Sequence, residues 1–282
     1  MGTSIMEEDK SFIQKKVVME DFFSGKLLYG DDFALPQIEK WYKEEAEAFA
    51  NLYGMSAEPY DFNHSIDNMY GFKYIEFIKQ FDQVLGFGSS WGYEFMPIVD
   101  KIKNLSIIEA SQQTRSKTLG GLVPRYITPT VKGDLDLPDN TFDLITCFSA
   151  MHHIPNVTFV MNELFRVLKP GGYFLLREPI HSMGDWRLER IGLTKNERGI
   201  PKDYFEKIIT NANMKTIRRN YYGFMGSFLE RFFHGSSILN SNIYLYIDKC
   251  LSDLFSFNSH YHETNKWQRI APIYVFYVLR KE

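Results

Sequence analysis

A glycine-rich stretch, VLGFGSSWGYE (residues 84–94), has the composition of a ligand-binding turn. It begins with apolar residues, as a short buried strand does, and Gly88 and Gly92 follow where the chain would turn into a helix. Glycine adopts positive φ and lets a ligand approach the backbone, and the first turn of a helix presents unpaired N–H groups. The stretch predicts a cradle for a small polar molecule, although a plain strand-to-helix connection has a similar composition.

An acidic residue, Glu109, ends the next apolar segment, SIIEA, and lies 21 residues after Gly88. A carboxylate at the tip of the second strand of a nucleotide-binding sheet can accept hydrogen bonds from two ribose hydroxyls. A dinucleotide fingerprint G-x-G-x-x-G that starts at Gly86 would need its third glycine where Trp91 stands. The pattern therefore favours a nucleoside cofactor and disfavours nicotinamide and flavin.

Strand-like and helix-like segments alternate between residues 81 and 179. Short apolar or β-branched runs predict strands, and longer runs with apolar residues at helical spacing predict helices. The expected strands are 83–87, 106–110, a strand and turn within 126–134, 142–148 and 173–179. The expected helices are 93–102, 112–119 and 157–168. Such alternation implies a parallel sheet covered on both faces, with ligands beyond the carboxyl ends of its strands.

Further helices are expected on either side of this region. Residues 35–53 predict an amphipathic helix whose charged run, EKWYKEEAE, faces solvent, and aromatic residues at helical spacing predict another helix at 69–81. The expected elements after residue 179 are a helix from Pro201, a strand at 215–219, two helices in the aromatic-rich stretch 221–266 and a closing strand after Ala271.

Composition restricts the class of protein. The 282 residues are 44% hydrophobic and carry a net charge of −3, without the basic excess of a phosphate-backbone binder, so we expect no nucleic acid partner. Two cysteines, Cys147 and Cys250, have neither disulfide-framework nor zinc-site spacing. The absence of a leader and of a long apolar run predicts a cytoplasmic protein with no integral membrane association. The cluster HYHE (residues 260–263) lacks a third ligand at metal-site spacing, so we expect a surface loop and no metal.

Four blocks between Phe81 and Pro179 together resemble the class I, Rossmann-like S-adenosylmethionine-dependent methyltransferases of the small-molecule type. The blocks are VLGFGSSWG, IIEAS, KGDLDLPDNTFDLITCFSAMHHI and ELFRVLKPGGYFLLREP. The resemblance implies an α/β fold with a doubly wound, mostly parallel seven-stranded sheet whose last strand is antiparallel. The expected parts are a helical N-terminal extension or lid (1–80), a cofactor-binding core (81–220), an aromatic-rich helical insertion or cap (221–266) and the final strand (267–282).

The resemblance implies S-adenosylmethionine as the cofactor. Gly88 and Gly92 would bound its methionine end, Glu109 would hold the ribose, Asp134 would face the adenine amino group and Leu135 would lie against the ring. The other expected cofactor-binding residues are Gly86, Phe87, Ser89, Ala110 and Ser149.

Two positions depart from the family pattern, which has an acidic residue where Gly86 stands and a glycine where Ser90 stands. The missing carboxylate would help to hold the cofactor's ammonium group. Glu94, Asp143 or a backbone carbonyl are the substitutes left open.

The implied reaction is an in-line methyl transfer in which alignment and exclusion of water do most of the work, with a general base for a hydroxyl acceptor. The candidate bases at the strand tips are His152, His153, Glu178 and His181. Imidazole titrates near neutral pH, although paired histidines in such a loop can simply hold it in place.

The expected function is methyl transfer to a small-molecule acceptor, with O-methylation of a sugar or hydroxylated metabolite favoured. A non-catalytic S-adenosylmethionine-binding scaffold or regulator and a nicotinamide-dependent reductase are the alternatives. Residues 36–80 and the insertion are expected to select the acceptor, and a homodimer contact is an alternative role for the insertion.

Overall fold

A single sheet of seven strands organises the computed structural model, which describes residues 19–53, 64–224 and 241–282. The strand order is β3-β2-β1-β4-β5-β7-β6. The strands are β1 (Val84–Phe87), β2 (Leu105–Ile108), β3 (Arg125–Ile127), β4 (Phe142–Phe148), β5 (Leu168–Pro179), β6 (Met214–Tyr222) and β7 (Tyr274–Lys281). Neighbouring strands from β3 to β5 pair in parallel, and β7 runs antiparallel between β5 and β6.

This topology confirms the expected seven-stranded, mostly parallel sheet with an antiparallel last strand. From β1 the order runs outward through β2 and β3 on one side and through β4 and β5 on the other. The chain therefore changes direction between β1 and β4, and in open α/β sheets that crevice at the carboxyl ends of the strands is where ligands bind.

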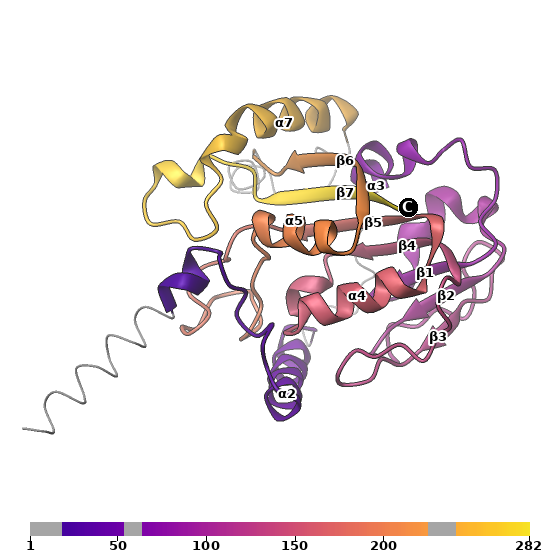
Figure 1. Ribbon diagram of the computed structural model, residues 1–282, viewed down its shortest axis with the longest axis horizontal. Coiled ribbons are helices and arrows are strands. Elements are labelled where there is room, and N and C mark those ends of the chain that lie inside the picture. The colour runs from indigo at the N-terminus through magenta and orange to yellow at the C-terminus, as the bar shows by residue number, and fades with distance from the viewer. Residues whose placement is uncertain (1–18, 54–63, 225–240) are drawn as a thin grey trace, which may run out of the picture.

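Both faces of the sheet are covered, because the central strands are apolar on both sides. Every residue of β1 and β2 is buried. One face packs against α4 (Val157–Val167) and α5 (Lys202–Asn211), which lie in front of the strands in Figure 1. The other face packs against α3 (His64–Tyr70), the 3₁₀ segment η2 (Tyr93–Lys101) and Leu245 of α7 (Asn242–Phe255).

Three expected helices differ in the structure. The segment expected at 93–102 is the 3₁₀ helix η2, in which Pro97 lacks the N–H that an α-helix needs. The helix expected at 69–81 does not form: α3 begins earlier and ends at Tyr70, and after Gly71 only the 3₁₀ turn η1 (Phe72–Tyr74) follows.

No helix forms at residues 112–119, where turns and bends replace it. Side chains there bond the local backbone instead: Ser111 Oγ accepts the Gln113 N–H, and Thr114 Oγ1 and Arg115 Nε donate to the Ser111 carbonyl. Such bonds compete with helix formation.

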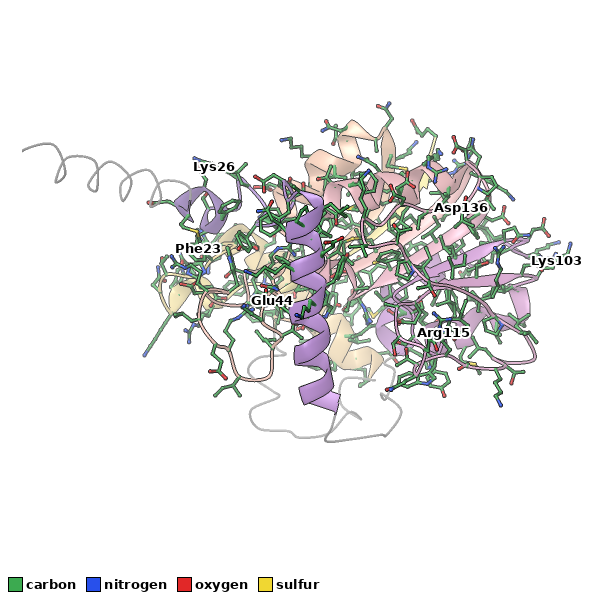
Figure 2. All side chains as sticks on the ribbon, turned by 90° about the horizontal axis from the view of Figure 1, so that it is seen from below. Phe23, Lys26, Glu44, Lys103, Arg115 and Asp136 are labelled. Carbon is green, nitrogen blue, oxygen red and sulfur yellow. The ribbon has the colours of Figure 1, made fainter. Side chains whose placement is uncertain are left out.

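The amino-terminal helix α2 (Leu35–Tyr53) has the predicted bounds. Ile38 and Trp41 are buried, and α2 projects from the sheet at the end of the molecule opposite α7 (Figure 1). Seen from below, it runs between the segment that carries Phe23 and the loops that carry Arg115 and Asp136 (Figure 2).

Helix α7, which lies in the aromatic-rich stretch 221–266, packs against β6. Tyr70 of α3 donates its hydroxyl to the Leu245 carbonyl of α7 at 2.7 Å. The other helix expected in 221–266, around Phe228 and Phe232, lies outside the described residues. Among the residues described, no helix has the length and apolar content needed to cross a bilayer.

Candidate functional site

The turn after β1 is built on positive backbone φ angles. Gly88, Ser90 and Gly92 have φ of 67°, 46° and 78°. A Cβ on Gly88 would lie 2.5 Å from the Cβ of Ala150, so this turn touches the loop after β4. A side chain at Gly88 would fill the space between the two loops, which explains why the sequence places glycine there.

Glu109, just beyond β2, holds the same turn from the other side. Its carboxylate accepts the Ser90 N–H at 3.0 Å and the Ser111 N–H at 2.9 Å, and the Tyr126 hydroxyl donates to the Ser90 carbonyl at 2.9 Å. A carboxylate has about four acceptor sites. The two N–H groups leave acceptor capacity that is suited to the two hydroxyls of a ribose.

A buried acid lies beside Gly86 despite the departure from the family pattern. A Cβ on Gly86 would lie 2.3 Å from Ser89 Oγ, and that hydroxyl donates to Glu94 Oε1 at 2.9 Å. Thr146 of β4 donates to the same oxygen, and Glu94 is only 3% exposed. Burial raises the pKa of Glu94 to about 7, against the lowering effect of the two hydroxyls.

Of the substitutes left open for the missing acid, Glu94 is therefore the one next to the glycine turn. Asp143 lies at the other end of β4, where it accepts the Gln83 N–H at 2.8 Å and pairs with Lys169 at 2.6 Å.

The remaining expected cofactor residues lie at or beyond the carboxyl ends of β1 to β4. Phe87 and Leu135 are buried, whereas Ala110 and Asp134 are exposed. The Leu135 N–H is fixed by Glu163 at 2.9 Å, and Asp134 accepts the Thr130 hydroxyl at 3.2 Å. Ser149 is exposed, has a φ of 59°, and donates its N–H to the Arg177 carbonyl.

Glu178, at the end of β5, fixes the loop after β4. Its side chain is fully buried, and Oε1 accepts the N–H groups of Ala150 at 2.9 Å and Met151 at 2.7 Å. Oε2 bonds to Nδ1 of His152 at 2.7 Å. A buried carboxylate needs such partners, and here they are supplied by the first residues of the 3₁₀ turn η3 (Met151–His153).

The three candidate histidines differ in environment. Burial alone would lower the pKa of His152, but the carboxylates of Glu178 and Glu197 raise it to about 9. His181 accepts the Met183 N–H on Nδ1 at 3.2 Å, and burial lowers its pKa to about 4, so its imidazole is neutral at pH 7. His153 bonds through Nδ1 to Glu45 Oε2 at 3.1 Å.

Sequence reasoning missed the partners of these histidines. Glu45 of α2 belongs to the charged run predicted to face solvent, yet it is 4% exposed and accepts the Thr194 hydroxyl and the Asn196 N–H. Glu197 lies in the long loop after β5, in which no spacing marks it. Arg198, beside it, is fully buried and donates to four backbone carbonyls, those of Tyr29, His152, Ile154 and Pro155.

The side chains of His262 and Glu263 in the HYHE segment bond to separate partners and not to a common centre. His262 Nδ1 bonds to Ser182 Oγ at 2.8 Å, and Glu263 pairs with Arg269 at 3.4 Å.

The match to a known family covers the same region as the four sequence blocks. Residues 84–176 match the family described as a methyltransferase domain. A sterol 24-C-methyltransferase of Yarrowia lipolytica is 38% identical over 91 residues, which are 29% of this chain and 24% of the relative. A demethylmenaquinone methyltransferase of Symbiobacterium thermophilum is 47% identical over 45 residues, 16% of this chain and 18% of the relative.

A phthiotriol/phenolphthiotriol dimycocerosates methyltransferase of Mycobacterium ulcerans is 27% identical over 125 residues, 38% of this chain and 46% of the relative. The chain thus spans less than half the length of each of these three relatives.

Solved structures share the fold at low identity. A SAM-dependent methyltransferase from Archaeoglobus fulgidus aligns with a TM-score of 0.50 and 12% identity, covering 77% of this chain and 94% of that one. The cyclase SpnF also aligns with a TM-score of 0.50, with 13% identity, covering 87% and 95% of the two chains. Residues 84–176, which include the glycine turn and Glu109, therefore match a methyltransferase domain, and the sheet shares its fold with a solved SAM-dependent methyltransferase.

Substitutions at Gly88 and Ser90, which both have positive φ, should have different effects on stability. Gly88→Ala should lower the free energy of unfolding by about 2 kcal/mol or more, because it adds a clash with Ala150 to a φ that disfavours side chains. Ser90→Gly should leave that free energy unchanged or raise it by up to about 1 kcal/mol, because it relieves a left-handed serine. Urea unfolding of both variants measures the difference, and equal stability of Gly88→Ala and the unaltered protein would contradict the geometry.

Glu94 should make stability depend on pH. Its pKa is raised from an ordinary value of 4.5 to about 7 in the folded protein, so the unfolded chain ionises first and stability falls as pH rises through this interval. The loss is on the order of 3 kcal/mol. Glu94→Gln should abolish it, so that the variant gains stability relative to the unaltered protein at pH 8 but not at pH 4.

Urea unfolding at the two pH values, with the exposed Glu76→Gln as a matched control, measures this effect. Parallel pH profiles for Glu94→Gln and the unaltered protein would show that Glu94 is not the titrating group.

Proposed function

We propose that this protein transfers the methyl group of S-adenosylmethionine to a small, largely apolar acceptor. The observation that carries the proposal is the glycine turn held between Glu109 and the loop after β4 at the point where the strand order changes direction. Three features at this point fit the cofactor: a backbone cradle without side chains, a carboxylate with spare acceptor capacity for a ribose, and the buried acid Glu94 for an ammonium group.

The chain's own residues would align the reactants. The bound cofactor supplies an activated methyl group on a positively charged sulfur, and displacement requires the acceptor atom to lie in line with the methyl–sulfur bond. Glu178 holds residues 150–152 rigidly at the carboxyl end of β4, next to Gly88. Fixing such a loop in one geometry reduces the entropy cost of reaching the transition state.

The amino-terminal helix would cover this end of the sheet. Trp41 of α2 donates its indole N–H to the His153 carbonyl at 2.8 Å, and Glu45 bonds to the His153 ring. Both contacts place α2 over the loop after β4, which supports the expectation that residues 1–80 act as a lid that excludes water from the reaction. Of the side chains of His152, Glu178 and His153, that of His153 is the most exposed beside this loop, at 23%.

The insertion would complete the acceptor side. Asp248 of α7 accepts the Gly223 N–H at 2.7 Å, just beyond the carboxyl end of β6, so α7 is anchored at the same edge of the sheet as the cofactor turn. The names of relatives specify a sterol, a demethylmenaquinone and phthiotriol dimycocerosates, which supports an apolar acceptor over a sugar.

Cofactor choice is testable by calorimetry with S-adenosylmethionine and with NADH. We expect S-adenosylmethionine to bind and NADH not to bind, and Glu109→Gln to weaken the affinity about 10-fold or more, because hydrogen bonds to a charged group are lost. Asp136→Asn, an exposed change in the neighbouring loop, is the matched control and should leave the affinity unchanged.

Undiminished binding by a folded Glu109→Gln variant, or tighter binding of NADH, would overturn the assignment. Transfer of an isotopically labelled methyl group to a lipid extract, followed by mass spectrometry, separates an enzyme from a non-catalytic binding protein.

A further inference from the structure

Two histidines and a glutamate converge next to the loop after β4. His152, His153 and Glu197 each present a ligand atom, and these atoms all lie within 4.8 Å of one another. The side chains are shielded, with exposed fractions of 8% for His152, 23% for His153 and 11% for Glu197. The three residues come from two segments that are far apart in the sequence, η3 and the loop before α5.

A buried carboxylate orients each imidazole. Nδ1 of His152 bonds to Glu178 at 2.7 Å, and Nδ1 of His153 bonds to Glu45 at 3.1 Å. Histidines that bind metals almost always bond through their second ring nitrogen to a carboxylate or carbonyl, which fixes the tautomer and the ring orientation. In both rings the nitrogen that would meet a metal is therefore Nε2.

The spacing between His152 and Glu197 suits a shared ion. Nε2 of His152 lies 3.5 Å from Oε1 of Glu197, which is long for a hydrogen bond. Two ligands bound at about 2.0–2.1 Å to one tetrahedral zinc ion lie roughly 3.4 Å apart.

The glutamate is also held in place before any ion binds. Oε2 of Glu197 accepts the Thr194 N–H at 3.0 Å, which turns Oε1 toward His152. Thr194 further donates to Glu45 at 2.6 Å, so one residue fixes both a ligand and the carboxylate behind the other ligand. Such supporting bonds keep a metal site in shape.

We propose that His152, His153 and Glu197 form a binding site for a divalent transition-metal ion, with zinc as the best match to two imidazoles and one carboxylate. Three protein ligands leave a fourth position for water or for an acceptor oxygen. The site joins α2, through Glu45, to the loop before α5. It replaces the expectation from the sequence that the chain holds no metal, and it does not depend on the proposed methyl transfer.

The test uses the full chain without an affinity tag, stripped with a chelator and titrated with zinc chloride by calorimetry. We expect one ion per chain and a midpoint of thermal unfolding that rises with zinc concentration, because an ion that binds only the folded state stabilises it. Cobalt(II) in place of zinc should give the visible absorption of a site with nitrogen and oxygen ligands.

Variants distinguish residues that bind the ion from residues that do not. Glu197→Gln and His153→Ala should each weaken zinc binding well over 10-fold, and Glu45→Gln, behind His153, should weaken it about 10-fold. His260→Ala, in the HYHE cluster, is the matched control and should bind as the unaltered protein does.

Two results would overturn the proposal. One is an unaltered protein that binds no zinc at micromolar concentration, which needs no variant to fold. The other is zinc binding by folded Glu197→Gln and His153→Ala variants with the affinity of the unaltered protein.

Discussion

The buried carboxylate of Glu178 is the constraint on which the site depends. It lies at the end of β5, fully removed from solvent. The N–H groups of Ala150 and Met151 and the ring of His152 form hydrogen bonds to it. An unpartnered carboxylate there would cost several kcal/mol, so the loop after β4 has little freedom to move away. Ala150 in turn sets how closely the glycine turn can approach.

The acid expected on β1 is absent, and a buried acid from a different place in the chain lies beside its position. Glu94 reaches the same buried space from η2, and the Ser89 hydroxyl fills the volume next to Gly86. The sequence motif is therefore altered while a carboxyl group remains next to the glycine turn.

The sheet could be predicted from the sequence because β1, β2 and β4 are mostly apolar runs, which a sheet covered on both faces requires. The 3₁₀ character of η2 could have been anticipated from Pro97, whereas the absence of a helix at 112–119 depends on side-chain bonds to the local backbone. The cluster around His152 and His153 could not be predicted, because Glu45 and Glu197 lie in charged segments whose sequence pattern is typical of a solvent-exposed surface. Only the tertiary contact of α2 with the loop before α5 buries them.

The position of β7 has a consequence for biosynthesis. This strand fills the gap between β5 and β6, yet it follows β6 only after α7 and the loops around it. While the ribosome is still making those residues, the facing edges of β5 and β6 have no neighbour to satisfy their backbone groups, and exposed edges of that kind recruit other chains. The nascent protein therefore passes through an interval in which chaperone protection matters most, and that interval ends when the last strand leaves the exit tunnel.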